Sequence, residues 1–391
     1  MPTDITKIIG GPALVKFGGA TFYSKGNILL ETQVTTFDVV TDRYRKVDER
    51  ATEMPLRVRF TPCGEWEALA VLYPYGATIL GDLITATRKM TSLLTVSSSF
   101  SVAGQVVNGS RVFLSTTGAL PAGLANNLPY FIGALVTPGT YSLYTTRANA
   151  LLGGATGLVA FTTVGTGQAA FVVQEALEIH CFDGTLYTFH NAAVVSMPDI
   201  NASTVATLMG EVIFEAFLKN LAAWSDADAR FTLGTSPLSD TSFDPAAIIT
   251  QAYTVTWGSA PWAALSTKTG VKINFDLQLE AIMTDTDGIV TRRLAGVSAV
   301  ATATPIGVSE ADLMAALQMQ GVNAGRGKTL VKNDLILQGT GVYVKLTGAA
   351  LKGGPQNFTS AEDRIGELTW AATRTFAAGV PNPLFTIGTA P

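Results

Sequence analysis

The chain has 391 residues, of which 14% are charged, 47% are hydrophobic and 38 are glycine. This length is enough for two or three ordinary domains, each with its own core, whereas the charged fraction is well below the roughly 25% of an average soluble protein. A chain with so little charge is expected to bury much of its exterior against other subunits, and its net charge of −4 argues against the basic surface that tight DNA binding needs.

The first part of the chain is predicted to be β-rich and to lack a secretory signal. The first thirty residues hold three lysines among glycines and polar residues, with no apolar run before a small-residue cleavage site. Apolar residues then alternate with arginine in Leu56–Phe60, the period-two pattern of a half-buried strand. The segment Glu65–Leu72 is predicted as a short helix, and its two glutamates are interpreted as partners of the helix dipole rather than as catalysts.

The densest run of charge in the chain lies just before that strand. It consists of Asp42, Arg43, Arg45, Lys46, Asp48, Glu49 and Arg50. One interpretation is a solvated hairpin tip. The other is a contact with a neighbouring subunit or ring, because mixed charges fix register without driving nonspecific aggregation. A second charged hairpin, with Asp287, Arg292 and Arg293, occupies the corresponding place later in the chain and favours the contact.

Residues 89–175 are predicted to form an inserted, small all-β domain. Between Met90 and Gln174 only Arg111 and Arg147 are charged, and short apolar runs alternate with Gly, Thr and Pro turns. The Gly and Thr content is too high for a membrane-spanning helix. No membrane insertion is predicted.

His180, Cys181 and His190 follow the insert and could suggest a zinc or copper site, since imidazole and thiolate are preferred ligands. Their spacing matches no structural zinc signature, so an ordinary pair of strand histidines is the preferred interpretation. No Gly-x-Ser-x-Gly or His-Glu-x-x-His motif occurs, and the chain has only two histidines. We therefore predict no enzyme and no metal or other cofactor.

Further helices and strands are predicted in the rest of the chain. A short helix is expected from about Ala202 to Leu208, and a strand at Val271–Phe275, where apolar residues again alternate. A helix is expected from the N-cap Ser309 to Gln320, just before a glycine. The loop 323–329 resembles the end of a phosphate-binding loop but lacks its first glycine, so nucleotide binding is not predicted.

Three blocks of sequence occur twice, in the same order. They pair Val15–Phe22 with Val255–Trp262, Thr61–Gly64 with Thr304–Gly307, and Gly210–Glu211 with Gly366–Glu367. The offsets are 255 − 15 = 240, 304 − 61 = 243 and 366 − 210 = 156 residues. The first copy therefore carries 243 − 156 = 87 residues that the second lacks, and the charge-poor insert accounts for them.

Several segments resemble the tail tube proteins of siphophages. They are Gly10–Ala20, Ile179–His190, Met209–Val212 and Gly366–Trp370. Proteins of this family share a β-sandwich-plus-helix module, which injection-tube proteins of contractile systems also use. The insert, through Ser115–Leu124 and Tyr130–Ile132, resembles a small β domain grafted onto phage virion proteins.

The resemblance implies a mainly β (α+β) fold with two tandem tail-tube-like β-sandwich or barrel modules. Each module has a flanking helix, and a small all-β domain is inserted in the first. The implied bounds are 1–88 and 176–235 for the discontinuous first module, 89–175 for the insert, and 236–391 for the second module.

The resemblance also implies a siphovirus major tail protein, assembled in the host cytoplasm into the virion tail. Its rings stack into the bacteriophage tail tube, and DNA passes through without specific binding during viral genome ejection. Two modules per chain predict a homo-oligomeric trimer with pseudo-sixfold symmetry rather than a hexamer. The implied partners are other copies of the chain and the tape measure, terminator and tip proteins, with the insert on the tube exterior.

Other functions stay open at this point. The leading alternative is a tail-tip or surface adhesin whose inserted β domain binds a saccharide. An enzyme ranks third, and a capsid or neck protein is a further possibility, since virion components share grafted domains.

Overall fold

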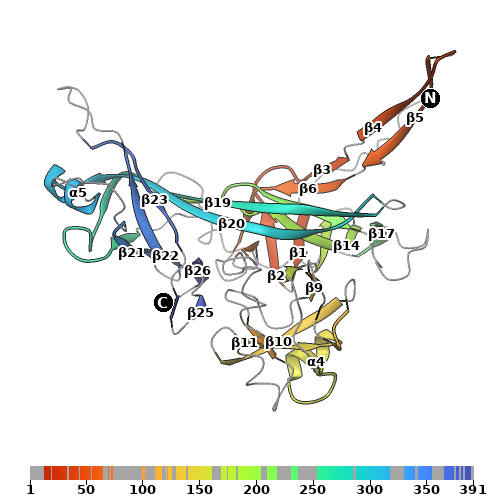
Figure 1. The fold of residues 1–391 in the computed structure, drawn as a ribbon, viewed down its shortest axis with the longest axis horizontal. Helices are drawn as coiled ribbons and strands as arrows, with labels where there is room; N and C mark the ends of the chain where they lie inside the picture. The colour runs from red at the N-terminus through yellow and green to blue at the C-terminus, as the bar shows by residue number, and fades with distance from the viewer. Residues whose placement is uncertain are drawn as a thin grey trace.

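A computed structural model describes the following residues of the chain: 13–18, 20–32, 35–43, 45–53, 55–64, 69, 72–73, 99–101, 111–116, 120, 122–125, 129–137, 140–160, 169–173, 175–181, 184–203, 209–217, 230–236, 253–284, 288–317, 330–339, 342–354, 365–373, 376–377, 380–381 and 384–388. The described chain is mainly β, as predicted. Two large sheets lie side by side, a smaller sheet hangs below the first of them, and a hairpin projects from one corner (Figure 1).

The first sheet has nine strands among the described residues, in the order β3-β6-β16-β14-β13-β1-β2-β7, with β17 beside β14. The strands are β1 (Ala13–Phe17), β2 (Ala20–Ser24), β3 (Leu29–Thr32), β6 (Leu56–Phe60), β7 (Pro62–Cys63), β13 (Glu175–Cys181), β14 (Thr185–Ser196), β16 (Val212–Phe217) and β17 (Phe231–Thr235). The predicted alternation is present in β6, because its apolar side chains are buried and its arginines are half-buried.

The second sheet has eight strands in the described ranges, in the order β15-β19-β20-β23-β22-β21-β18, with β26 beside β22. The strands are β15 (Ile200–Ala202), β18 (Thr254–Trp257), β19 (Ser266–Thr284), β20 (Gly288–Ile306), β21 (Lys332–Gly339), β22 (Val342–Gly353), β23 (Leu368–Ala371) and β26 (Phe385–Gly388). A separate ribbon pairs β24 (Phe376–Ala377) with β25 (Val380–Pro381). Strand β15 lies by sequence in the predicted first module, so strands from both predicted modules share this sheet.

The two large sheets repeat one strand order. In the first, β3-β6-β16-β14-β13-β1 corresponds to β19-β20-β23-β22-β21-β18 in the second, and β17 and β26 take the same additional place. The register agrees with the sequence offsets. Phe60 pairs with Val212. Adding the offset of the second block, 243, to the first residue and that of the third block, 156, to the second gives Ala303 and Leu368, and these two residues also pair with each other. We call these two sets of strands the first and second repeats. The tail-tube character and the domain bounds remain predictions.

The recurring aromatic residues occupy the same place in both repeats. Phe17 packs against Phe214 with ring centroids 4.8 Å apart, and their counterparts Trp257 and Trp370 lie 6.4 Å apart. All four side chains are buried in one continuous core that includes both repeats. Aromatic side chains bury much apolar surface each, so the recurrence of these pairs explains why the blocks can be recognised in the sequence.

Each repeat contains a long hairpin with the same irregularities. The first hairpin is β4 (Thr35–Thr41) with β5 (Arg45–Glu53), and the second consists of the distal halves of β19 and β20. In the first hairpin the register shifts just after Thr35 and just after Val39. In the second hairpin it shifts just after Gln278 and Ile282, the residues that lie 243 positions further along the chain. Such shifts mark β-bulges, which reset the twist of a ribbon. The two hairpins are therefore structural equivalents.

One predicted helix is present where the sequence places its start. Helix α5 (Glu310–Ala316) follows Ser309, whose side chain accepts a hydrogen bond from the backbone N–H of Asp312 at 3.1 Å. The helix ends before Leu317, and the predicted continuation over 318–320 lies outside the described residues. Within the described ranges, no helix has both the length and the apolar character needed to cross a lipid bilayer.

The other two predicted helices have different outcomes. Of the segment Glu65–Leu72, Leu69 is helical and buried, and 65–68 and 70–71 lie outside the described residues. The helix predicted from Ala202 is wrong at that residue, because Ala202 is the last residue of β15 and pairs with Val271 of β19. Residues 204–208 lie outside the described part of the chain.

The insert forms its own sheet, with the order β12-β9-β10-β11-β8. Its strands are β8 (Ser99–Ser101), β9 (Arg111–Thr116), β10 (Pro129–Thr137), β11 (Thr140–Tyr144) and β12 (Ala169–Val173). The all-β prediction is wrong in one respect, since α4 (Arg147–Leu152) is helical. Thr146 caps it by accepting from Asn149 N–H at 3.3 Å, and alanine and leucine, which dominate the helix, are good helix formers.

Tyr73 joins the two repeats at their junction. Its hydroxyl donates to Pro198 O at 2.8 Å, and its ring lies edge-on to Phe275 of β19 with centroids 5.2 Å apart. Complete burial, followed by the nearby charge of Asp199, raises the pKa of Tyr73 well above its ordinary value. The hydroxyl is therefore neutral and able to donate at neutral pH.

The Tyr73→Phe variant is expected to lower the free energy of unfolding by about 1–3 kcal/mol, because the buried carbonyl of Pro198 loses its donor. The raised pKa of Tyr73 contributes stability that is present below the ordinary tyrosine pKa of about 10 and is lost as the pH rises further, since the unfolded chain ionises first. Urea unfolding near pH 7 and near pH 10 measures both effects. An equal loss for Tyr187→Phe, a half-buried tyrosine of β14, would contradict the assignment.

Candidate assembly surface

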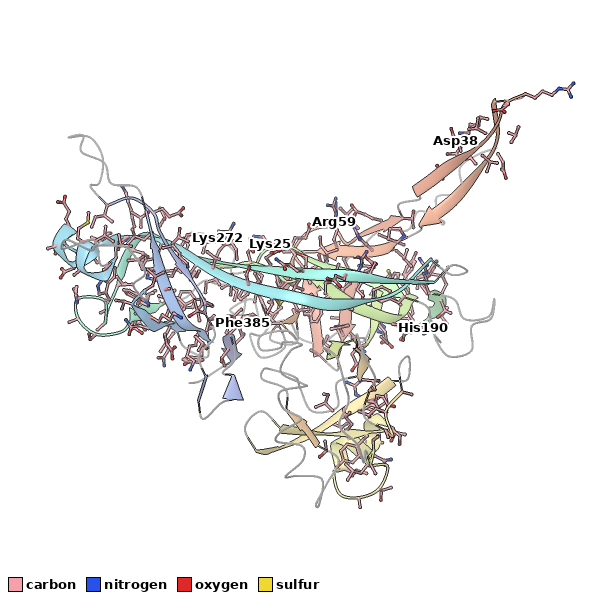
Figure 2. All side chains as sticks on the ribbon, viewed as in Figure 1. Lys25, Asp38, Arg59, His190, Lys272 and Phe385 are labelled. Atoms are coloured by element: carbon pink, nitrogen blue, oxygen red, sulfur yellow. The ribbon has the colours of Figure 1, made fainter. Side chains whose placement is uncertain are left out.

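The first hairpin projects from the rest of the molecule. Among the described strands, β4 and β5 pair with each other alone, and they extend away from both large sheets (Figure 1). Asp38 lies on this projection (Figure 2). A two-stranded ribbon by itself is marginally stable in water, so this one is expected to gain packing from a partner.

Charged side chains form a network on the first hairpin. Lys46 Nζ lies 2.6 Å from Asp38 Oδ1 and 2.9 Å from Glu49 Oε2, and the Thr36 hydroxyl donates to the Glu49 carboxylate. Hydrogen bonds to Asp38 and then Glu49 raise the pKa of Lys46, while hydrogen bonds from Thr36 and then Lys46 lower the pKa of Glu49. All these groups are exposed. Exposed ion pairs add little stability, so this network mainly orders the surface.

The remaining charged residues predicted for the first hairpin are distributed around its tip. Asp42 and Arg43 are exposed at the turn, and Asp48 is exposed on β5. The side chains of Arg45 and Arg50 lie outside the described residues. Two valines, Val40 and Val47, are also exposed on this hairpin. Apolar side chains among ordered charges are typical of a contact surface, which needs both burial and register.

Arg292 of the second hairpin has a different environment. Its Nε lies 2.9 Å from Glu215 Oε1, and Arg57 Nε lies 3.1 Å from Glu215 Oε2. The Glu215 side chain is only 2% exposed. Arg292 therefore fixes the second hairpin to β16 of the first repeat within one chain, and a contact of this hairpin with another subunit remains a prediction. Asp287 and the side chain of Arg293 lie outside the described residues.

Sequence reasoning missed Glu215, the residue that holds the second hairpin in place. It is the one acidic residue in Val212–Phe217, a strand that is otherwise apolar. Buried carboxylates are rare unless they are paired, so a lone acid within an apolar strand was the available signal. Its two arginine partners lie 158 and 77 residues away in sequence, and no local pattern connects them.

The two histidines lie on strands and bond to ordinary neighbours. His180 Nε2 is 3.0 Å from Glu178 Oε2, and His190 Nε2 is 3.1 Å from Thr232 Oγ1. In the part of the chain that the structure describes, no three His, Cys, Asp or Glu side chains are grouped as metal ligands.

The architecture defines a mainly β protein that contains one strand order twice. Comparison with models of known protein families finds no match, and comparison with curated proteins finds none either. The function is therefore argued from the repeated geometry and from the sequence.

Proposed function

We propose that the chain is a structural subunit that polymerises as stacked rings into a bacteriophage tail tube. The observation that carries the proposal is the contrast between two equivalent hairpins. The second hairpin lies along β14 and β16 of the first repeat, whereas the first hairpin, with the same bulges, projects away from both large sheets (Figure 1). A repeat that already packs against the other repeat of the same chain is suited to pack against the repeats of further chains.

The repeated strand order of the two large sheets supports a ring rather than a closed dimer. Contact of a second repeat with a first repeat uses two different surfaces, which is a heterologous contact, and such contacts generate rings when the rotation closes. Six equivalent units would then come from three chains. The net charge of −4 is consistent with a conduit for DNA, because a lumen without basic patches would not hold the phosphates.

Electron microscopy of the purified, negatively stained chain tests the proposal. We expect rings or tubes with a uniform outer diameter, and sedimentation velocity should show a concentration-dependent shift from single chains to large assemblies. A chain that sediments as a monomer at every concentration, and shows no rings in the images, would overturn the proposal.

A second candidate function, an adhesin, has one observation in its favour. The insert forms a separate sheet beneath the first repeat (Figure 1), and its helix α4 exposes Leu151 and Leu152. Adjacent exposed leucines are typical of a surface that contacts another molecule. A glycan array probed with the whole chain, and with a variant that lacks the insert, distinguishes the two functions, because saccharide binding that disappears with the insert favours the adhesin.

Deletion of residues 90–174 is expected to leave ring and tube formation intact, because the insert shares no sheet with either repeat among the described strands. Arg147 Nη1 lies 3.3 Å from Glu175 Oε2, and Glu175 is buried. The deletion is therefore combined with Glu175→Gln, so that no carboxylate stays buried without its arginine. Circular dichroism checks folding. A folded deletion variant that fails to polymerise would contradict an exterior position for the insert.

A further inference from the structure

The edge of β3 is an exposed apolar strand edge. Strand β3 ends the first sheet, so among the described residues only one of its two edges is paired. Leu29 is 42% exposed and Leu30 is 44% exposed. Edge strands with exposed apolar side chains are templates for pairing with another chain, and proteins normally protect them.

The equivalent edge in the second repeat is covered. Leu30 pairs with Val58 in the first repeat. The corresponding residues of the second repeat, 243 positions later, are Ile273 and Ala301, and they also pair with each other. On its other side Ile273 pairs with Ile200 of β15 and is only 1% exposed. The same strand position is thus buried in one repeat and exposed in the other.

The covered edge is a closely fitted junction. Asp199 Oδ2 lies 3.3 Å from Nζ of Lys272, which is labelled in Figure 2, beside the three residue pairs that join β15 to β19. Gly270, at φ +92, brings the backbones so close that a Cβ there would lie 2.2 Å from Ala202 O. Strand β15 follows β14 in the first repeat. The chain therefore contains a complete example of how one repeat covers the β3-type edge of the other.

We propose that the exposed edge of β3 is the docking edge for a second copy of this chain, which adds a strand from its second repeat as β15 is added to β19. The inference rests on the proposed function and names the surface through which subunits join. It commits to a second copy because the internal junction already shows this mode of covering between the two repeats. Repetition of that junction from chain to chain gives head-to-tail contacts, which a ring requires.

The chemistry of the two edges agrees with this assignment. Lys272 in the covered edge corresponds to Leu29 in the exposed one. Asp199, the partner of Lys272, corresponds in sequence to Pro355, which lies outside the described residues. Neither of the two corresponding residues is charged. Glu31, the acid on β3, already pairs with Arg59 Nε at 2.9 Å within the first sheet, and the exposed apolar part of the docking edge consists of Leu29 and Leu30.

The Leu30→Asp variant tests the docking edge. A charge on this edge would be buried without a partner in the assembly but stays in water in the single chain. We expect the concentration for half-maximal assembly, measured by sedimentation velocity, to rise at least tenfold. The matched control is Leu233→Asp on β17, where leucine is 63% exposed and assembly should be unchanged. Urea unfolding checks that both variants fold.

Hydrogen exchange of the wild-type chain gives a second measurement. In assembled protein we expect the backbone amides of β3 to be protected relative to the single chains of the Leu30→Asp variant. If wild-type rings form but Leu30→Asp assembles equally well, or if β3 exchanges freely within rings, the docking edge is wrong and the proposed function stands. If the wild-type chain never assembles, both are wrong.

Discussion

Replacement of Glu215 by alanine is expected to lower the free energy of unfolding by about 3–5 kcal/mol, the usual cost of removing one partner from a buried ion pair. Glu215 accepts from Arg57 at 3.1 Å and from Arg292 at 2.9 Å, and it is almost completely buried. Its loss leaves the mostly buried guanidinium of Arg292 without its acceptor. The second hairpin is then expected to separate from β16.

Chemical unfolding of the variants, followed by tryptophan fluorescence, measures this effect. Glu211→Ala is the matched control, because Glu211 lies next to the same strand and faces Arg59 at 3.9 Å but is exposed, so its loss should cost about 0–1 kcal/mol. A double-mutant cycle with Arg292→Ala isolates the pair. Additive effects of Glu215→Ala and Arg292→Ala would contradict the direct contact.

The Gly270→Ala variant is expected to lower the free energy of unfolding by about 2–5 kcal/mol. The backbone at φ +92 costs an L-residue about 1–2 kcal/mol, and overpacking adds about 1–3 kcal/mol. The added Cβ would lie 2.2 Å from Ala202 O, a backbone atom that a rotamer change cannot move. The variant therefore forces β15 away from β19.

Gly26→Ala separates the two causes. Gly26 has φ +95, and nothing lies within 4 Å of its added Cβ, so this control should lose about 1–2 kcal/mol from backbone strain alone. Thermal unfolding of the three proteins, with hydrogen exchange at β15, measures the difference. Equal losses for both glycine variants would show that the close approach of β15 to β19 is absent.

Much of the strand pattern could be predicted from the sequence, because it depends on residues that pack in the core. Phe17 and Trp257 are buried at equivalent places, and each is followed five residues later by a buried aromatic residue, Phe22 on β2 and Trp262 in the turn after β18. The offset of the second block extends unchanged through β6 and β20 and through both bulges of the hairpins. Because both repeats need the same core packing, the same types of buried residue recur in the sequence at the same spacing.

The environment of the two hairpins could not be predicted in the same way. Both hairpins carry mixed charges, and the sequence suggested one role for both. The second hairpin is fixed by Glu215, whose partner Arg292 lies 77 residues away in sequence, so no local pattern connects the two. Helix α4 was missed for a related reason, since a six-residue helix held by the Thr146 cap is too short to show a period of its own.

In the proposed ring, first and second repeats alternate around the circumference. Cryo-electron microscopy of the assembled protein can test this arrangement, because a map of one ring gives both the number of chains and the identity of the strand beside β3. We expect three chains per ring, six repeats in alternation, and a strand from a neighbouring second repeat along Leu29 and Leu30. Six whole chains per ring, with β3 facing solvent, would contradict the account.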